Sequence, residues 1–357
     1  MSTYINLQEH YSNTLQCPCA HMSITNNEFI MFLNATYHPI CSSNNFVNKW
    51  FNYFFIYQDG RAWWLNVNDF RYWSILFFNF LEKYCKLANS TVNNAIEQFN
   101  LVSFVSSEVM SPILFKTQVD MTINLLQKSI LILFARQLQM FRGVIQGNGL
   151  ISSLETSMEF KVDQIAVDAP VFVIPKTYNN GTCSCATSST CVELASFYNV
   201  THHTVYTIEN IFIGCFLIES ILHSSLSCFF SNSCMTDLMK ATILGIPGPN
   251  WQPRMIDISP LQFSSSTSNF RINDTIETMV YQLFIDFWSS EISYERYYNA
   301  CAPTHCTYSY EKRLDVLYAV TIFLTVINGL SLGLRFVVPI FVRLVYKLRN
   351  RLCGYYE

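Results

Sequence analysis

The stretch Val316–Leu334 reads VLYAVTIFLTVINGLSLGL, and its nineteen residues carry no formal charge. This is about the length that an α-helix needs to cross the hydrocarbon core of a bilayer. Apolar residues resume after Arg335 and continue to Val342. We therefore predict one C-terminal transmembrane helix, which occupies 314–345 with its flanks.

Basic residues follow this helix. The last fifteen positions hold four basic side chains and one acidic side chain, which are Arg343, Lys347, Arg349, Arg351 and Glu357. Lys and Arg concentrate in the cytoplasmic flanks of membrane helices. The charge therefore predicts a basic cytosolic tail over 346–357 and an extracytoplasmic, cysteine-rich domain over 1–311. The expected location is the plasma membrane, and the expected partner of the helix is membrane lipid.

Twelve of the thirteen cysteines precede the predicted helix, and Cys353 alone follows it. A membrane that separates an oxidising from a reducing compartment produces this distribution. The disulfide candidates are Cys17, Cys19, Cys41, Cys85, Cys183, Cys185, Cys191, Cys215, Cys228, Cys234, Cys301 and Cys306. Spacing does not fix their pairing, and it leaves Cys228–Cys234 and Cys301–Cys306 open as short local loops.

Five Asn-x-Thr sequons lie in the predicted extracytoplasmic domain. The glycosylation candidates are Asn34, Asn89, Asn180, Asn199 and Asn273. A chain this rich in Asn, Ser and Thr gives about five such matches by chance. All five use Thr although Ser is the commoner residue, which chance explains less well, so the sequons support export weakly.

The first residues do not supply an export signal. Met1–Gln16 has no basic start, no apolar core and no small-residue cleavage site. Two explanations stay open. The chain begins after an upstream membrane segment, or it is a tail-anchored protein whose body faces the cytosol and whose twelve cysteines are reduced.

Composition excludes some classes of protein. Of the 357 residues 50% are apolar and 13% are charged, and the formal net charge is −3. Apolar surface on this scale offsets chain entropy, which excludes disorder. The small net charge predicts no nucleic acid partner.

Chemical motifs are scarce. The two Cys-x-Cys pairs and His202-His203 lack the spacing of zinc sites, and oxidised cysteines cannot bind as thiolates. We therefore predict no metal and no cofactor. The motifs G-x-S-x-G and H-E-x-x-H and the phosphate-binding loop do not occur. We predict that the protein is not an enzyme, although dispersed catalytic groups would leave no such signature.

Apolar spacing predicts mostly helices before the membrane. The expected helices cover Asn89–Ser107, Pro112 to about Arg142, Ile211–Phe230 and Asp274–Tyr298. The second of them has the clearest start, because Ser111 supplies a capping hydroxyl and Pro112 fits the first turn. The aromatic stretch 61–86 is predicted to be core, and 150–182 alternate like short strands. The predicted fold class is mainly α, with α+β possible, as a disulfide-stabilised ectodomain before one transmembrane helix.

The predicted membrane helix contains small residues. Gly329 and Gly333 are four positions apart with Ser331 between them. This spacing lets helices approach closely in lipid, so a homo-oligomer through the helix is possible, although glycine is also simply tolerated in membrane helices. Arg335 is expected to reach the inner interface, and Pro339 to kink or end the helix there.

Several segments together resemble an uncharacterised family of invertebrate membrane proteins. They are Cys301-Ala-Pro-Thr-His-Cys306, Asn328-Gly-Leu-Ser-Leu-Gly-Leu-Arg335, Cys17-Pro-Cys19, Cys183-Ser-Cys185 and Gly214-Cys215. The resemblance implies an N-terminal membrane segment, a cysteine-rich ectodomain and a C-terminal span, with this chain beginning just after the first span. It implies no activity.

The layout also resembles the degenerin/epithelial sodium channel architecture, whose second span has a G-x-S motif like Gly329-Leu-Ser331. No acidic residue follows in the span, and Arg335 would oppose a cation pore. We therefore expect a membrane-anchored surface protein with a recognition or adhesion ectodomain for an unknown extracellular ligand. The alternative is a subunit of a degenerin-like ligand-gated ion channel.

Overall fold

The computed structural model describes residues 1–43, 45–58, 65, 67–148, 155–162, 170–243, 257–263, 268–311 and 315–353. The chain divides into two compact units. The terminal unit combines Met1–Cys17 with His305–Glu357, and the central unit is Pro18–Thr304. Helix predominates over strand, with 55% of the described residues against 20%.

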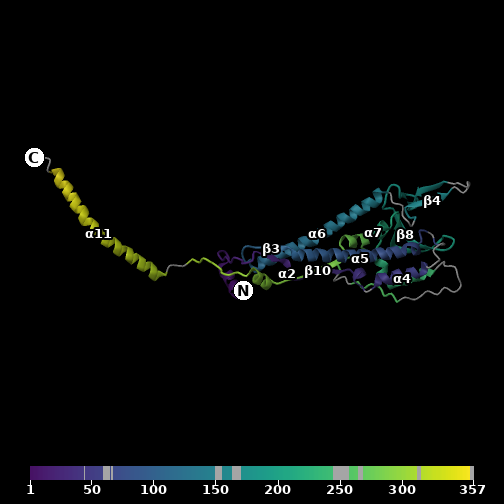
Figure 1. The fold of residues 1–357 in the computed structure, drawn as a ribbon, viewed down its shortest axis with the longest axis horizontal. Coiled ribbons are helices and arrows are strands. Elements are labelled where there is room, and N and C mark those ends of the chain that lie inside the picture. The colour runs from purple at the N-terminus through teal and green to yellow at the C-terminus, as the bar shows by residue number, and fades with distance from the viewer. Residues whose placement is uncertain are drawn as a thin grey trace. The chain divides into compact units, whose positions relative to one another are not determined.

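The terminal unit contains α1 (Ser2–Tyr11) and α11 (Val316–Cys353) (Figure 1). Its N-terminal segment is tied to the residues that precede α11. Cys17 and Cys306 form a disulfide, and Gln16 and Thr307 exchange two backbone hydrogen bonds of 2.8 Å. The N-terminal segment is therefore joined covalently to the segment that leads into α11.

Helix α11 matches the predicted spanning segment. It continues through Pro339, so of the two outcomes expected at that residue, a kink or an end, the end is wrong. Among the described residues it is the one helix long and apolar enough to cross a membrane, and none of its candidate spanning stretch is buried. Its 38 residues extend about 57 Å, well beyond the roughly 30 Å of a hydrocarbon core.

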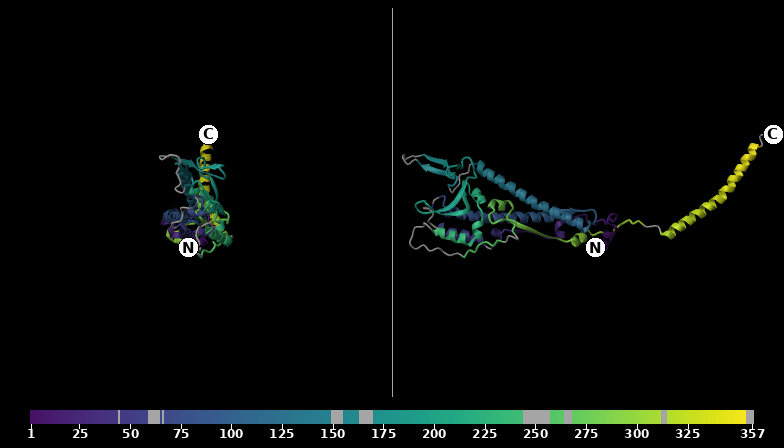
Figure 2. Two further views of the ribbon diagram at one scale, coloured as in Figure 1. Left: turned by 90° about the vertical axis from the view of Figure 1, so that its right-hand side faces the viewer. Right: turned by 180° about the vertical axis from the view of Figure 1, so that it is seen from behind.

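Three long helices organise the central unit. They are α4 (Phe46–Gln58), α5 (Phe70–Leu101) and α6 (Pro112–Gly147). Figures 1 and 2 show α5 beside α4, while α6 lies along one edge of the unit and diverges from α5. Helix α5 begins where the Asp69 carboxylate accepts a hydrogen bond from the Arg71 N–H. Helix α6 begins as predicted, with the Ser111 hydroxyl accepting from Leu114.

The other described elements are short. The helices are α2 (Asn26–Phe29), α3 (Pro39–Ser42), α7 (Leu217–His223), α8 (Asn232–Ile243), α9 (Ile276–Tyr281), α10 (Tyr294–Cys301) and the 3-10 turn η2 (Ser227–Phe230). The strands form antiparallel pairs: β1 (Ser23–Thr25) with β3 (Ser103–Val105), β2 (Ile30–Tyr37) with β10 (Ile285–Ile292), β4 (Met158–Val162) with β5 (Val171–Pro175), β6 (Thr177–Tyr178) with β7 (Cys183–Ser184), and β8 (Val192–Tyr198) with β9 (Thr204–Gly214).

Two groups of buried apolar side chains stabilise the central unit. The main core lies against α5, where Trp50 stacks on Phe78 with ring centroids 5.8 Å apart. A smaller aromatic cluster lies at the N-terminal end of α6, where Phe115 stacks on Tyr297 with ring centroids 4.2 Å apart. The disulfide Cys19–Cys301 joins the segments beside this smaller cluster.

Three helix predictions need correction. The helix expected at Asn89–Ser107 starts at Phe70 and ends at Leu101, because the aromatic stretch and the later pattern share one apolar face. Ile211–Phe230 is not one helix but the end of β9, then α7 and η2. Asp274–Tyr298 is divided into α9, β10 and α10. Positive φ angles at Leu283 and Phe284 interrupt the helical path, and β10 then pairs with β2.

All twelve cysteines before α11 are bonded in six disulfides. The pairs are Cys17–Cys306, Cys19–Cys301, Cys41–Cys85, Cys183–Cys191, Cys185–Cys215 and Cys228–Cys234. The expectation of disulfides and the local pair Cys228–Cys234 are confirmed. The local pair Cys301–Cys306 is wrong, because each of these cysteines bonds instead to the Cys-Pro-Cys turn, which the fold brings from the other end of the chain.

Candidate functional site

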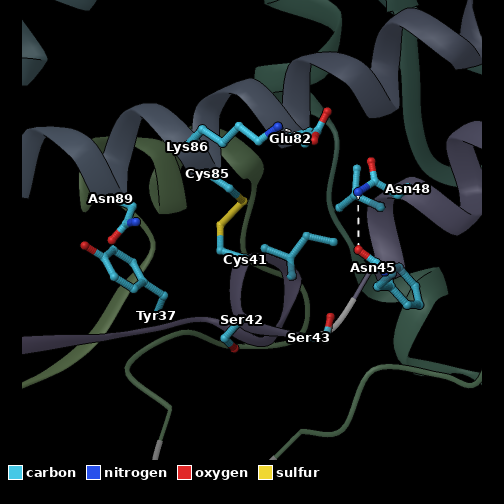
Figure 3. Close-up of a pocket in the computed structure, with 13 residues that line it drawn as sticks. Tyr37, Cys41, Ser42, Ser43, Asn45, Asn48, Glu82, Cys85, Lys86 and Asn89 are labelled. Carbon is cyan, nitrogen blue, oxygen red and sulfur yellow. Dashed lines mark hydrogen bonds and ion pairs between the residues drawn. A yellow bond between two sulfur atoms is a disulfide. The ribbon is translucent and has the colours of Figure 1, made fainter.

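A pocket of about 390 Å³ lies between α3 and α5 in the central unit (Figure 3). Its walls come from the end of β2, from α3 and the residues after it, and from the middle of α5. The disulfide Cys41–Cys85 crosses from one wall to the other. Figure 3 shows Tyr37 and Asn89 on one side of this bond and Asn45 and Asn48 on the other.

Local sequence fixes the α3 wall. Pro39 occupies the first turn, and His38 caps it by accepting the Ile40 N–H at its ring Nδ1, 3.3 Å away. The His38 ring is buried edge-on against Phe230 and Phe270, each with centroids 5.7 Å away. Burial lowers the pKa of His38 to about 4, an effect that Asp286 partly opposes, so the ring is neutral at pH 7.

Two hydroxyl groups in the lining have no hydrogen-bond partner within the described residues. They are the buried Oη of Tyr37 and the buried Oγ of Ser43. Burial raises the pKa of Tyr37 to about 12, so its hydroxyl stays protonated and able to donate. A buried hydroxyl without a partner costs about 1–3 kcal/mol. Both oxygens are closed off from solvent, so a molecule in the pocket would reach them only if the lining moved.

Charge in the pocket is balanced. Lys86 Nζ lies 2.5 Å from Glu82 Oε1, one turn away on α5, and the lysine is mostly exposed. Such a helix-surface pair contributes at most about 0.5 kcal/mol, so a ligand can separate it at little cost. The lining thus contains hydroxyls, amides and a dipolar pair. These groups suit the binding of a polar, uncharged molecule.

The sequons are distributed over the surface of the central unit. Asn34, Asn89, Asn180 and Asn273 are exposed, and Asn199 is half-buried. Asn89 lines the pocket, and its Oδ1 accepts a hydrogen bond from Asn93. A glycan on Asn89 would cover the pocket mouth. Glycosylation at all five positions stays a prediction, and at Asn89 it is an alternative to the use of the pocket by a ligand.

The small residues of the candidate spanning helix lie on α11. A Cβ added at Gly329 or Gly333 would meet nothing within 4 Å. The described structure therefore leaves the Gly329, Ser331 and Gly333 face open, and helix association through it stays a prediction.

Sequence analysis missed two ionic clusters that hold the central unit together, one buried and one half-buried. Arg71 binds Asp69 at 2.7 Å and the carbonyl of Tyr198 at 2.5 Å. Such buried charges need full pairing. They buttress the core and lie outside the pocket.

The second cluster is centred on Arg142. It donates to Glu219 on α7 and to Glu277 on α9, and the hydrogen bonds that the Glu219 carboxylate accepts raise the pKa of Arg142. The pairing ties the end of α6 to both short helices, and a lone arginine after an apolar run gave no signal for it.

Pocket residues were also missed by sequence analysis, except for Cys41, Cys85 and Asn89. Tyr37, Ser43 and Glu82 belong to no motif, and they meet beside the Cys41–Cys85 bond, a pairing that spacing does not reveal. No protein-family model, no curated protein and no solved structure matches this chain. The site is therefore interpreted from its geometry.

Proposed function

We propose that this chain is a membrane-anchored surface protein whose disulfide-bonded ectodomain recognises an extracellular ligand. The observation that carries the proposal is the segregation of cysteines about α11. Six disulfides precede this exposed apolar helix, and Cys353 at its end has no cysteine left to pair with in the chain. Disulfides persist in oxidising compartments, and the basic end of α11 favours the cytosol. The plasma membrane is the location that fits both.

The α3–α5 pocket is the recognition site we propose. Its ligand would be a small, neutral molecule rich in hydroxyl groups, such as a sugar, because such a molecule can pair with the exposed amides of Asn45 and Asn89 and with the Glu82–Lys86 couple at once. The disulfide Cys41–Cys85 would keep the two walls at a fixed separation, which reduces the ordering cost of binding.

The channel-subunit alternative depends on Gly329-Leu-Ser331 and on the resemblance in layout. Arg335, four residues after Ser331 on α11, opposes a cation pore. Current recording from cells that express the full-length protein separates the two functions, because a recognition protein gives no ligand-evoked current.

Thiol labelling tests the oxidation of the twelve cysteines, on which the proposed orientation depends. Cells that express the full-length chain are treated with a membrane-permeant maleimide without reductant, before and after a Cys353→Ser substitution. We expect one labelled thiol in the original chain and none in the variant, because the other twelve cysteines are bonded. Labelling of the twelve cysteines without reductant would remove both the orientation and the ectodomain.

The pocket has an independent test. Tyr37→Phe removes a buried hydroxyl that has no partner, so we expect the free energy of unfolding to rise by about 1 kcal/mol. The matched control Tyr53→Phe removes a hydroxyl that donates to the Met239 carbonyl and should lower it. A loss at Tyr37 would show that its hydroxyl has a partner in the folded chain. A glycan at Asn89, detected as a mobility shift that Asn89→Gln abolishes, would contradict the pocket assignment.

A further inference from the structure

Helix α6 exposes a stripe of large apolar side chains to solvent. Leu114, Met121, Leu125 and Ile132 are 55%, 61%, 66% and 52% exposed. Their spacings of 7, 4 and 7 residues place them within about 40° of one another around the helix. We call these four residues the outer stripe.

The outer stripe is not the face that α6 packs into the core. The buried residues of α6 lie on the opposite side, at Phe115, Val119, Ile123, Ile130, Phe134 and Leu138. A surface helix normally carries one apolar face, and a helix apolar on two faces is covered on both. The central unit covers only the inner one, and α6 lies at the edge of the unit in both figures (Figures 1 and 2).

The spacing of the outer stripe is self-complementary. Leu114 and Ile132 lie nine positions on either side of residue 123, and Met121 and Leu125 lie two positions on either side. An antiparallel second α6 that crosses at residue 123 brings Leu114 onto Ile132 and Met121 onto Leu125. A two-fold interface requires this kind of self-matching patch.

The polar residues on the same side select the antiparallel orientation. Gln118 and Lys128 are exposed and lie five positions on either side of residue 123. In the antiparallel register each Lys128 ammonium meets a Gln118 amide, whose oxygen can accept its hydrogen bond. In a parallel register each Lys128 would face another Lys128, and the like charges would repel.

We propose that α6 pairs antiparallel with α6 of a second copy of this chain through the outer stripe, about a two-fold axis at the level of residue 123. The stripe extends about 27 Å from Leu114 to Ile132. The proposal concerns a different surface from the α3–α5 pocket and does not depend on it.

Cysteine cross-linking in native membranes tests the pairing. Full-length Cys353→Ser chains with two different tags are co-expressed, one with Leu114→Cys and the other with Ile132→Cys, and then oxidised. We expect a cross-link between the two tags. We expect none when both chains carry Leu114→Cys or both carry Ile132→Cys, because like positions are about 27 Å apart in this register. The control pair replaces Leu114→Cys by Asn94→Cys on α5 and should not link.

Two results would overturn the proposal. One is the absence of the Leu114–Ile132 cross-link, and the other is efficient linking of like positions, which indicates a parallel pair. A second substitution keeps the test independent of the introduced thiols. Leu125→Ser in both chains should reduce the cross-link roughly tenfold, whereas exposed Asn124→Ser, which lies off the stripe, should leave it unchanged.

Discussion

The two long helices of the central unit, α5 and α6, bury their apolar residues differently. Only Leu87 and Leu101 are large apolar side chains that α5 exposes among its described residues. Helix α6 exposes nine, namely Ile113, Leu114, Met121, Leu125, Ile132, Leu133, Met140, Phe141 and Val144. Within a single chain α5 therefore buries nearly all of its large apolar side chains, whereas α6 leaves many of them exposed.

The difference does not come from a poorly packed α6. Its inner face contributes Ile130, Phe134 and Leu138 to the main core, and Phe115 to the smaller aromatic cluster. Because the inner face already packs against the core, and the outer stripe lies on the opposite side of the helix, the outer stripe is a second apolar face. The comparison teaches that α5 serves the fold of one chain, whereas α6 serves both that fold and an association.

The largest effect is expected from the core side of α5. Phe78 is fully buried and stacks on Trp50, so Phe78→Ala should lower the free energy of unfolding by about 4 kcal/mol. The control Asn94→Ala, on the exposed side of α5, should change it by less than about 0.5 kcal/mol. Denaturant unfolding of the solubilised chain measures both. A cost below about 1 kcal/mol at Phe78 would mean that α5 does not organise the core.

The next effect concerns covalent support, which α5 has through Cys85 and α6 lacks. Removal of the Cys41–Cys85 bond by the double substitution to Ser should cost about 3 kcal/mol, because it releases a loop of 44 residues. The matched removal of Cys228–Cys234, which closes a separation of six, should cost less. Equal losses in denaturant unfolding would show that loop closure is not the source. Neither change should weaken the α6 cross-link.

The sequence predicted features that have a local signal. Ser111-Pro112 marks the start of α6 because a capping hydroxyl and a proline act within one turn. Val316–Leu334 marks α11 because length and apolarity alone decide it. The strand β10 was predicted as helix because its partner β2 lies about 250 residues away, and only that pairing selects strand over helix.

The candidate site was less predictable for the same reason. The cysteines were found, because oxidation needs only their number and compartment, but the bond Cys41–Cys85 depends on the fold. Tyr37, Ser43 and Glu82 meet beside that bond only in the folded unit. The outer stripe of α6, by contrast, depends on spacing within one helix. It was missed because the inner face satisfied the helical pattern first.

Acid should destabilise the fold around α5 and leave the association through the outer stripe unchanged. The pKa of buried His38 is lowered from its ordinary 6.5 to about 4, so between these values the unfolded chain binds a proton that the folded chain does not. The free energy of unfolding should therefore decrease as the pH is lowered, by about 2 kcal/mol between pH 7 and pH 4.5.

The substitution His38→Asn keeps an acceptor for the Ile40 N–H and removes the titration. The loss of unfolding free energy between pH 7 and pH 4.5 should be smaller in this variant by the contribution of His38. Denaturant unfolding at a series of pH values measures it. An unchanged slope would assign the acid sensitivity to other groups. The outer stripe contains no histidine or carboxylate, so the Leu114–Ile132 cross-link should not change over this range.

The smallest effect is expected at the outer stripe, and it depends on protein concentration. In dilute detergent solution Leu125→Ala should change the free energy of unfolding by less than about 0.5 kcal/mol, because Leu125 is exposed in the single chain. At high concentration the original chain should gain stability by association and the variant should not. Phe134→Ala, on the inner face, should cost about 3 kcal/mol at every concentration. If Leu125→Ala cost as much as Phe134→Ala regardless of concentration, the stripe would belong to the core of one chain, and α6 would not differ from α5.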